Sequence, residues 1–223
     1  MTKPILLSWS SGKDSAWSLY KLQQNPDYEV VGLVTTVNKK YQRVAMHGVR
    51  ERLLQQQADA AGLPLHVLNI PSPCTNQEYQ DVMKSFITVM QQDGIEYMAF
   101  GDLYLQDIRQ YREQQLANTG IKPVFPLWQQ PTRELAEQMI SEGLEATITC
   151  IDPKKLSADF VGQGFDLDFI NQLPNGVDPC GENGEFHSCV HNGPMFNYPI
   201  PVNTGEIVER DNFIFIDLIP ELS

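Results

Sequence analysis

The sequence predicts an α/β protein, with a doubly wound parallel sheet at the N-terminal end and a smaller α+β part at the C-terminal end. Through residues 1–125, short apolar segments rich in β-branched residues alternate with segments whose apolar residues recur at helical spacing. Such alternation is typical of a parallel sheet covered by helices on both faces. Hydrophobic residues make up 42% of the 223 residues, which is enough to bury a sizeable core.

The elements of the N-terminal part follow from this alternation and from the residues that interrupt it. We expect strands at residues 5–10, 29–36, 65–70 and 97–100, a short extended piece at 124–128, and helices at 13–24, 49–61, 76–92 and 105–118. Gly62 is placed to end the second helix, and Pro71 and Pro73 end the third strand.

The composition changes between Pro126 and Pro131, so we divide the chain into residues 1–125 and 126–223. In the second part we expect helices at residues 132–142 and 165–173, and strands at 146–151, 185–191 and 213–218. Thr132 is placed to cap the first of these helices. Residues 174–184 hold glycines and prolines but few apolar residues, which indicates turns.

A candidate phosphate-binding loop follows the first strand. Residues 8–15 read Ser-Trp-Ser-Ser-Gly-Lys-Asp-Ser and open the first helix, where unpaired N–H groups and the helix dipole favour an anion. Gly12 allows a close approach of the backbone, Lys13 adds a positive charge, and Asp14 suits such a site if Mg²⁺ lies between it and the phosphates. The hydroxyls of Ser10, Ser11 and Ser15 can donate hydrogen bonds. The alternative is an ordinary Ser-capped helix after a strand.

Two further pairs of residues follow predicted strands. Thr35 and Thr36 end the second strand, and Gly101 and Asp102 follow the fourth. Because the carboxyl ends of parallel strands meet at one edge of a sheet, we expect both pairs to lie near the candidate loop, where α/β sheets bind ligands.

A second informative segment lies late in the chain. Residues 180–188 read Cys-Gly-Glu-Asn-Gly-Glu-Phe-His-Ser, so two glycines bracket Glu182 and Asn183, and Glu185 follows at once. Carboxylates presented in this way can hold Mg²⁺, orient ammonia or accept a proton. The alternative is a glycine-rich turn with solvated acids.

The candidate loop resembles the S-G-G-x-D-S pyrophosphate loop of the N-type ATP pyrophosphatases, with Ser11 at the position of the first Gly. The late segment resembles the G-E-G-G-E-[YF]-E-T motif of one branch of that superfamily, the diphthine–ammonia ligase family. Other motifs of that family occur in the same order, at Gly101-Asp102-Leu103, Arg109, Arg112-Glu113, Pro126-Leu127-Trp128 and Gly143-Leu144-Glu145-Ala146. The resemblance therefore covers nearly the whole chain.

The resemblance implies a cytoplasmic enzyme with an adenine nucleotide alpha hydrolase-like (HUP-type) domain at its N-terminal end. It implies an ATP-dependent ligase that forms AMP and pyrophosphate: a carboxylate attacks the α phosphate, pyrophosphate leaves, and ammonia attacks the acyl-adenylate. The expected cofactors are ATP and Mg²⁺, and the expected partners are ammonia and a small-molecule or protein-borne carboxylate. The sequence leaves open whether the chain forms a homo-oligomer.

Candidate site residues follow from these motifs. We expect catalytic roles for Lys13, Asp14, Glu182 and Glu185, with Asp14 also a ligand of the metal. We expect ATP to contact Ser8, Ser10, Ser11, Gly12, Lys13, Asp14, Ser15, Thr35, His47 and Gly101. We expect the substrate to contact Asp102, Arg109, Arg112, Glu113, Asn183 and His187.

Some of these assignments have open alternatives. His47 is equally suited to a helix cap or a packed side chain. Arg109 and Arg112 share a helix face and suit a carboxylate or phosphate, or else a surface pairing with Asp107 or Glu113.

This chain departs from the family pattern mainly where the substrate is expected. Asn183 replaces a Gly, His187-Ser188 replace Glu-Thr, and residues 105–109 differ from Ser-x-Tyr-Gln-Arg. The resemblance therefore supports the reaction class of the family more strongly than it supports the identity of the acceptor. An ATP-binding sensor that has lost its chemistry is one alternative function, and a related RNA-thiolation enzyme is another.

Composition excludes several other classes. A net charge of −12 argues against a large basic surface for nucleic acid, and no apolar run approaches the length of a membrane span. Four scattered cysteines are typical of a reducing compartment. A zinc site formed by Cys180, His187, Cys189 and His191 is a further alternative, but the spacing fits no standard zinc motif.

Overall fold

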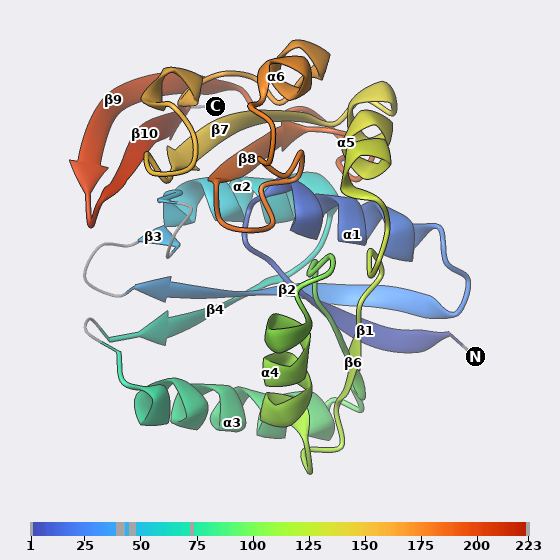
Figure 1. Ribbon diagram of the computed structural model, residues 1–223. Coiled ribbons are helices and arrows are strands. Elements are labelled where there is room, and N and C mark those ends of the chain that lie inside the picture. Colours follow the sequence, from blue (N-terminus) through green and yellow to red (C-terminus); the bar gives the residue numbers. More distant parts are fainter. Residues whose placement is uncertain (1, 39–42, 45–47, 72–73, 222–223) are drawn as a thin grey trace.

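The computed structural model describes residues 2–38, 43–44, 48–71 and 74–221, and it contains two β-sheets with helices between and around them (Figure 1). The N-terminal elements are β1 (Lys3–Ser8), α1 (Lys13–Gln23), β2 (Tyr28–Asn38), β3 (Arg43–Val44), α2 (Glu51–Ala61), β4 (Leu65–Ile70), α3 (Asn76–Gln92), β5 (Tyr97–Ala99), α4 (Gln106–Leu116) and β6 (Lys122–Val124). The later elements are α5 (Thr132–Ser141), β7 (Glu145–Ile151), the 3₁₀ helix η1 (Ala158–Phe160), α6 (Leu167–Gln172), β8 (Phe186–Asn192), β9 (Val202–Arg210) and β10 (Phe213–Pro220).

The N-terminal sheet is doubly wound. β1 pairs in parallel with β2 on one side and with β5 on the other, and β4 and β6 extend the sheet beyond them. The short β3 adds an antiparallel pairing to β2. Helices α1 and α2 cover one face of this sheet, and α3 and α4 cover the other (Figure 1). The winding reverses between β1 and β5, where α/β sheets bind their ligands. The predicted fold class is confirmed.

The C-terminal sheet is antiparallel, in the order β8-β7-β10-β9. It lies over α1 and α2 on the side away from the N-terminal sheet (Figure 1). One hydrophobic cluster includes Trp9 and Leu19 from the N-terminal part together with Met139, Ile148 and Phe186 from the C-terminal part. The two sheets therefore share one core.

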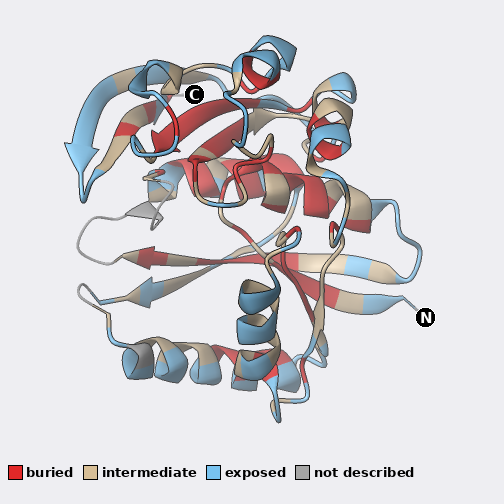
Figure 2. Cartoon of the chain, viewed as in Figure 1, coloured by how far each residue is buried: buried red, intermediate tan, exposed pale blue. Residues whose placement is uncertain are grey.

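Burial is concentrated between the two sheets. Figure 2 shows buried residues along α1 and α2, whereas α3 and α4 are exposed over much of their length. In α1, even the polar side chains of Lys13, Ser15 and Ser18 are buried. Within the described part of the chain, no helix combines the length and apolarity that crossing a membrane requires.

Most predicted elements are present with ends shifted by a few residues, and Gly62 ends α2 with a φ of 69°. β3, β9 and η1 were not predicted from the sequence. The extended piece expected at 124–128 is instead the end of β6 followed by a turn. Thr132 was wrongly predicted as a cap, because it is the first residue of α5 and its hydroxyl bonds to Asp178. The boundary drawn between residues 125 and 126 stays a prediction.

Candidate active site

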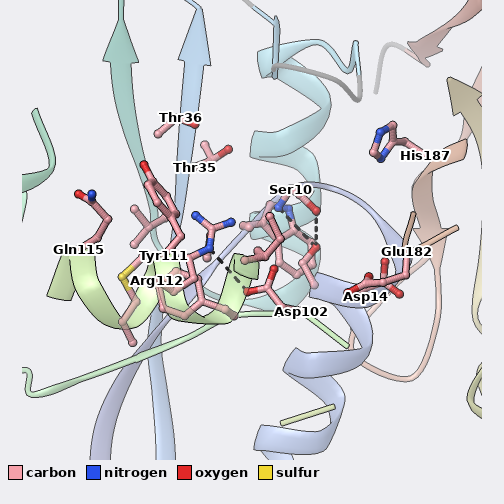
Figure 3. A pocket seen from close by; sticks show the side chains of 18 of the residues that line it. Ser10, Asp14, Thr35, Thr36, Asp102, Tyr111, Arg112, Gln115, Glu182 and His187 are labelled. Carbon is pink, nitrogen blue, oxygen red and sulfur yellow. Dashed lines mark hydrogen bonds and ion pairs between the residues drawn. The ribbon is translucent and has the colours of Figure 1, made fainter. Parts of the chain in front are cut away.

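A cavity of about 540 Å³ opens at the carboxyl ends of β1, β2 and β5, bounded by α1, α3, α4 and the segment before β8 (Figure 3). The sequence-predicted residues that line it are Ser8, Ser10, Lys13, Asp14, Ser15, Thr35, Gly101, Asp102, Arg112, Glu182 and His187. The structure thus brings residues far apart in the chain to one place.

The other predicted site residues do not line the cavity. Ser11 and Gly12 form the buried back of the phosphate loop, which we define as residues 8–15. Asn183 and Glu185 belong to the segment bordering the cavity, and His47 lies outside the described residues. Arg109 and Glu113 are considered separately below.

The phosphate loop contains a residue in the left-handed region. Ser11 has a φ of 74°, which favours glycine over residues with a side chain. Its carbonyl accepts hydrogen bonds from Val190 N at 3.0 Å and from Gln57 Nε2 at 3.1 Å. These two partners, from β8 and α2, hold the loop in a conformation that Ser11 alone does not favour.

Gln57 is a fully buried side chain that organises this region. Besides bonding to Ser11, its amide donates to Val190 O at 2.7 Å and accepts from Trp9 Nε1 at 2.9 Å. Sequence analysis missed Gln57, because a single glutamine within a helix carries no spacing signal.

The start of α1 is packed closely against the loop after β5. A Cβ on Gly101 would lie 3.0 Å from the carbonyl carbon and oxygen of Asp14. Any larger residue there would push the two segments apart. Within the loop, Ser15 Oγ donates to Gly12 O at 2.9 Å and lies 3.2 Å from Ser10 Oγ.

Lys13 is 2% exposed, and its side chain points toward the C-terminal part. Its Nζ lies 2.9 Å from Asp14 Oδ2, donates to the carbonyl of Cys180, and lies 5.7 and 5.4 Å from the ring centres of Phe165 and Phe186. Burial is the largest influence and by itself lowers the pKa of Lys13, but the charge of Asp14, the hydrogen bond to it and the charges of Cys180 and Glu182 together outweigh burial, so the pKa is raised.

Asp14 lies beside Glu182 at one end of the cavity (Figure 3). Burial raises the pKa of Asp14, and the charge of Lys13 opposes that shift. Its second oxygen, Oδ1, is buried and has no hydrogen-bond partner among the described residues. A carboxylate oxygen left in this state at a phosphate loop fits the ligand preference of Mg²⁺.

We call residues 178–185 the acidic loop. Glu182 Oε1 accepts hydrogen bonds from Leu103 N at 2.9 Å and Tyr104 N at 3.4 Å, which links this loop to the segment after β5. Burial raises the pKa of Glu182 to about 7, against the opposing effect of the Leu103 N–H.

Asp178 holds the acidic loop together. Its Oδ1 accepts from Cys180 N at 2.8 Å and Glu182 N at 3.3 Å, and Thr132 Oγ1 donates to its Oδ2 at 2.7 Å. Glu185 is 3% exposed, and its Oε1 accepts from Asp178 N at 3.0 Å. Sequence analysis missed Asp178, since a lone aspartate in a turn-rich segment is a common feature.

Arg112 and Asp102 lie further along the cavity (Figure 3). Arg112 Nε is 3.6 Å from Asp102 Oδ2, and its guanidinium lies 5.0 Å from the centre of the Phe100 ring. Burial raises the pKa of Asp102, and the charge of Arg112 opposes this shift. The neighbouring wall is mainly apolar and aromatic, formed by Val34, Tyr79, Met83, Ile87, Met98, Phe100, Ile108, Tyr111 and Leu116.

Arg109 has a different environment. Its Nε lies 2.8 Å from Glu113 Oε1, and its guanidinium lies 4.9 and 4.7 Å from the ring centres of Phe125 and Trp128. Arg109 is therefore paired with Glu113, as one of the two alternatives for it expected. A contact of Arg109 or Glu113 with the substrate stays a prediction.

Both parts of the chain match one protein family. Residues 2–123 match the diphthamide synthase N-terminal domain, and residues 131–218 match the diphthamide synthase C-terminal domain. The chain belongs to the diphthamide synthase family. This confirms the prediction of a divergent member and of an enzyme of the ligase class.

Relatives of this diphthamide synthase family member include three mammalian proteins named diphthine–ammonia ligase. The Bos taurus and Homo sapiens proteins are 24% identical over 226 residues, and the Rattus norvegicus protein is 25% identical over 226 residues. Each alignment covers 89% of this chain and 82% of the relative.

The departures of this family member from the motif pattern lie at its site. Ser188 Oγ accepts a hydrogen bond from Lys13 N at 3.2 Å, a contact that the hydroxyl of the usual threonine can also make. Asn183 Nδ2 donates to Glu185 Oε1 at 3.1 Å. Among the described residues, no group of three or more His, Cys, Asp or Glu side chains is arranged to hold a metal ion, which leaves the zinc alternative without support.

Proposed function

We propose that this protein is an ATP-dependent ligase that adenylates a carboxylate and transfers ammonia to it, with AMP and pyrophosphate as products. One observation carries the proposal. A single cavity joins the phosphate loop at the start of α1, the carboxylates of Asp14 and Glu182, and the guanidinium of Arg112. The family relatives named diphthine–ammonia ligase support the same reaction class.

The proposed reaction has two steps. An acceptor carboxylate oxygen attacks the α phosphorus of ATP, and the bond to the β phosphate breaks to release pyrophosphate. The nitrogen of ammonia then attacks the acyl carbon, AMP leaves with the bonding electron pair, and the nitrogen gives up a proton. The product is a carboxamide.

We place the triphosphate at the phosphate loop. The N-cap residue of α1, Gly12, provides no side-chain cap, and the helix dipole favours an anion at this end. Ser10 and Ser15 line the cavity beside this helix end. Asp14 Oδ1 would hold Mg²⁺, which supplies charge neutralisation for the leaving pyrophosphate when bound.

We place the adenosine along the ends of β2 and β5. Thr35 and Thr36 lie near the carboxyl end of β2 and line the cavity, and Met83 and Met98 supply apolar contacts suited to a purine ring. Gly101 keeps the loop after β5 close to α1, which leaves space for the nucleotide.

We assign the proton transfer to Glu182. Its Oε1 is held by two backbone N–H groups, so its position is fixed before the reaction begins. A pKa of about 7 suits a base that works near neutral pH. Glu185, which was predicted as catalytic, acts in this scheme by holding Asp178 and Asn183 in the acidic loop.

We assign recognition of the acceptor carboxylate to Arg112, since a guanidinium binds a carboxylate in a bidentate manner. Asp102 lies beside Arg112 and orients its guanidinium. The acceptor is a small-molecule or protein-borne carboxylate. The four cysteines are free thiols, which fits the cytoplasmic location predicted from the sequence, and the acidic charge disfavours the RNA-thiolation alternative.

The test is product analysis with Mg²⁺–ATP, ammonium and a panel of carboxylic acids. Acceptor-dependent release of AMP and pyrophosphate in equal amounts supports the proposal. Formation of ADP and phosphate contradicts it. Saturable binding of ATP without turnover across the panel would favour the sensor alternative.

A further inference from the structure

We propose that Lys13 is a positioning residue that fastens the acidic loop to the phosphate loop, and that it is not a ligand of the ATP phosphates. The role of the fastened loop in catalysis rests on the proposed function. The fastening itself rests only on contacts within the chain.

The amine of Lys13 is enclosed by partners from both parts of the chain. Asp14 Oδ2 lies 2.9 Å away, the Cys180 carbonyl accepts a hydrogen bond, and the rings of Phe165 and Phe186 lie within cation–π distance. Moving the amine to a phosphate would leave the buried Cys180 carbonyl and Asp14 Oδ2 without this donor. These contacts therefore favour the position of the Lys13 amine beside Cys180 and Asp14 over a position at the phosphates.

The backbone of Lys13 bonds to the C-terminal part as well. Its N–H donates to Ser188 Oγ at 3.2 Å, and two residues earlier the carbonyl of Ser11 accepts from Val190 N at 3.0 Å. The start of α1 thus bonds to β8 through its main chain and to the acidic loop through its side chain.

Helix geometry explains why Lys13 and Asp14 have different roles. Successive residues of a helix point about 100° apart around its axis, since there are about 3.6 residues per turn. Both residues border the cavity, but the amine of Lys13 is bonded toward the C-terminal part, whereas Asp14 keeps an oxygen that has no hydrogen-bond partner among the described residues. Asp14 then faces the phosphates while Lys13 balances its charge from behind.

Cys180, whose carbonyl is bound by Lys13, is linked to the rest of the acidic loop through Asp178. Asp178 Oδ1 binds both Cys180 N and Glu182 N. A fixed Cys180 carbonyl therefore limits the movement of Glu182, whose carboxylate is bound in turn to Leu103 and Tyr104. Without Lys13, the loop loses this attachment to α1, and the position of Glu182 loses one of its restraints.

The experiment compares wild type with Lys13→Met, which keeps most of the length and the apolar contacts of the side chain but removes its amine and charge. Lys21→Met is the matched control, because Lys21 lies on the same helix and stacks on Trp17 and Tyr20. Hydrogen–deuterium exchange of residues 178–185 and calorimetric titration with Mg²⁺–ATP are measured on each full-length protein.

We expect exchange in the acidic loop to rise about tenfold or more in Lys13→Met, with the dissociation constant of ATP raised by less than about tenfold. The control leaves both unchanged. Unchanged loop exchange in Lys13→Met, or a larger loss of ATP affinity, overturns the proposal.

A second measurement covers the case in which Lys13→Met does not fold. In wild type, a lysine drawn away by phosphates would release the loop, so exchange at residues 178–185 would rise on adding Mg²⁺–ATP. We expect it to stay the same or fall. If the wild type binds no ATP, the proposed function fails, while the mutant comparison of loop exchange still tests the fastening.

Discussion

The side-chain amide of Gln57 donates a 3.1 Å hydrogen bond to the main-chain carbonyl of Ser11, a phosphate-loop residue with a positive φ. A residue of α2 thereby stabilises a loop that is distant in the sequence. Because the same amide also bonds to Trp9 and Val190, the loop, α2 and β8 depend on one buried polar group.

Gln57→Leu is expected to lower the free energy of unfolding by about 2–3 kcal/mol, because it leaves buried polar partners unsatisfied. Denaturant unfolding measures this. Gln55→Leu is the control, since Gln55 lies on the same helix and makes an exposed bond to Asp59, and it should change stability by less than about 0.5 kcal/mol. Equal effects of the two changes would show that Gln57 has no special role.

Ser11→Gly is expected to leave the free energy of unfolding unchanged or to raise it by up to about 1 kcal/mol, because glycine tolerates a φ of 74°. Ser11→Val should lower it by at least about 2 kcal/mol, since a β-branched residue is strained in that region. Thermal unfolding of the two variants side by side checks the sign. A clear loss of stability in Ser11→Gly would show that the hydroxyl matters more than the backbone.

Glu182 is expected to give the enzyme a pH dependence. As a base with a pKa raised to about 7, it must be deprotonated, so kcat/KM should rise with pH and level off above about 7. Glu182→Gln should remove this limb of the profile and lower turnover by at least about 100-fold. A profile that keeps its shape in the variant would assign the limb to another group.

The same carboxyl affects stability with a definite sign. Its pKa is raised from 4.5 to about 7 in the folded protein, so folding favours the protonated form. Its contribution to stability is fully present below about pH 4.5 and is lost as pH rises through about 7. Over this window, the unfolding free energy of wild type should fall relative to that of Glu182→Gln, which denaturant titrations at several pH values will measure.

Asp14→Asn is expected to abolish the Mg²⁺ dependence of ATP binding and to lower turnover by at least about 100-fold. Asparagine retains an acceptor for Lys13, so the fold should persist, whereas alanine would leave the buried amine of Lys13 without that acceptor. Calorimetric titration of the variant with ATP, with and without Mg²⁺, separates a loss of the Mg²⁺ dependence from a loss of the fold. Binding in Asp14→Asn that still requires Mg²⁺ would place the metal on another ligand.

Arg112→Met is expected to raise the KM for the acceptor carboxylate by about 10- to 100-fold, with a smaller effect on the KM for ATP. Arg109→Met is the matched control on the same helix. It should leave both KM values unchanged and lower stability by about 1 kcal/mol, because Arg109 stacks on Phe125 and Trp128. If Arg109→Met raised the KM for the acceptor and Arg112→Met did not, acceptor binding would belong to Arg109 instead of Arg112.

The sequence predicted the N-terminal sheet well, because buried parallel strands and amphipathic helices each have a distinct pattern. It did not predict β9, whose residues are mostly exposed, so that strand shows no alternation between a buried and an exposed face. It also did not indicate that Lys13 turns toward the acidic loop, since that direction depends on how the second sheet lies over α1.

The candidate site was predicted unevenly for a similar reason. Motif residues such as Asp14 and Glu182 could be proposed because their neighbours in sequence marked them. Gln57 and Asp178 were missed because they act through hydrogen bonds to segments far away in the chain. No local pattern records such bonds.

Placing α1 between two sheets has a consequence for how the protein is made. A ribosome releases the N-terminal strands and α1 long before β8, which supplies the Val190 N–H and the Ser188 hydroxyl to the start of α1. Until then, Ser11 lacks one of its supporting bonds and Lys13 has no Cys180 carbonyl to bind. A nascent chain therefore lacks these supports for the candidate nucleotide site until synthesis has passed β8.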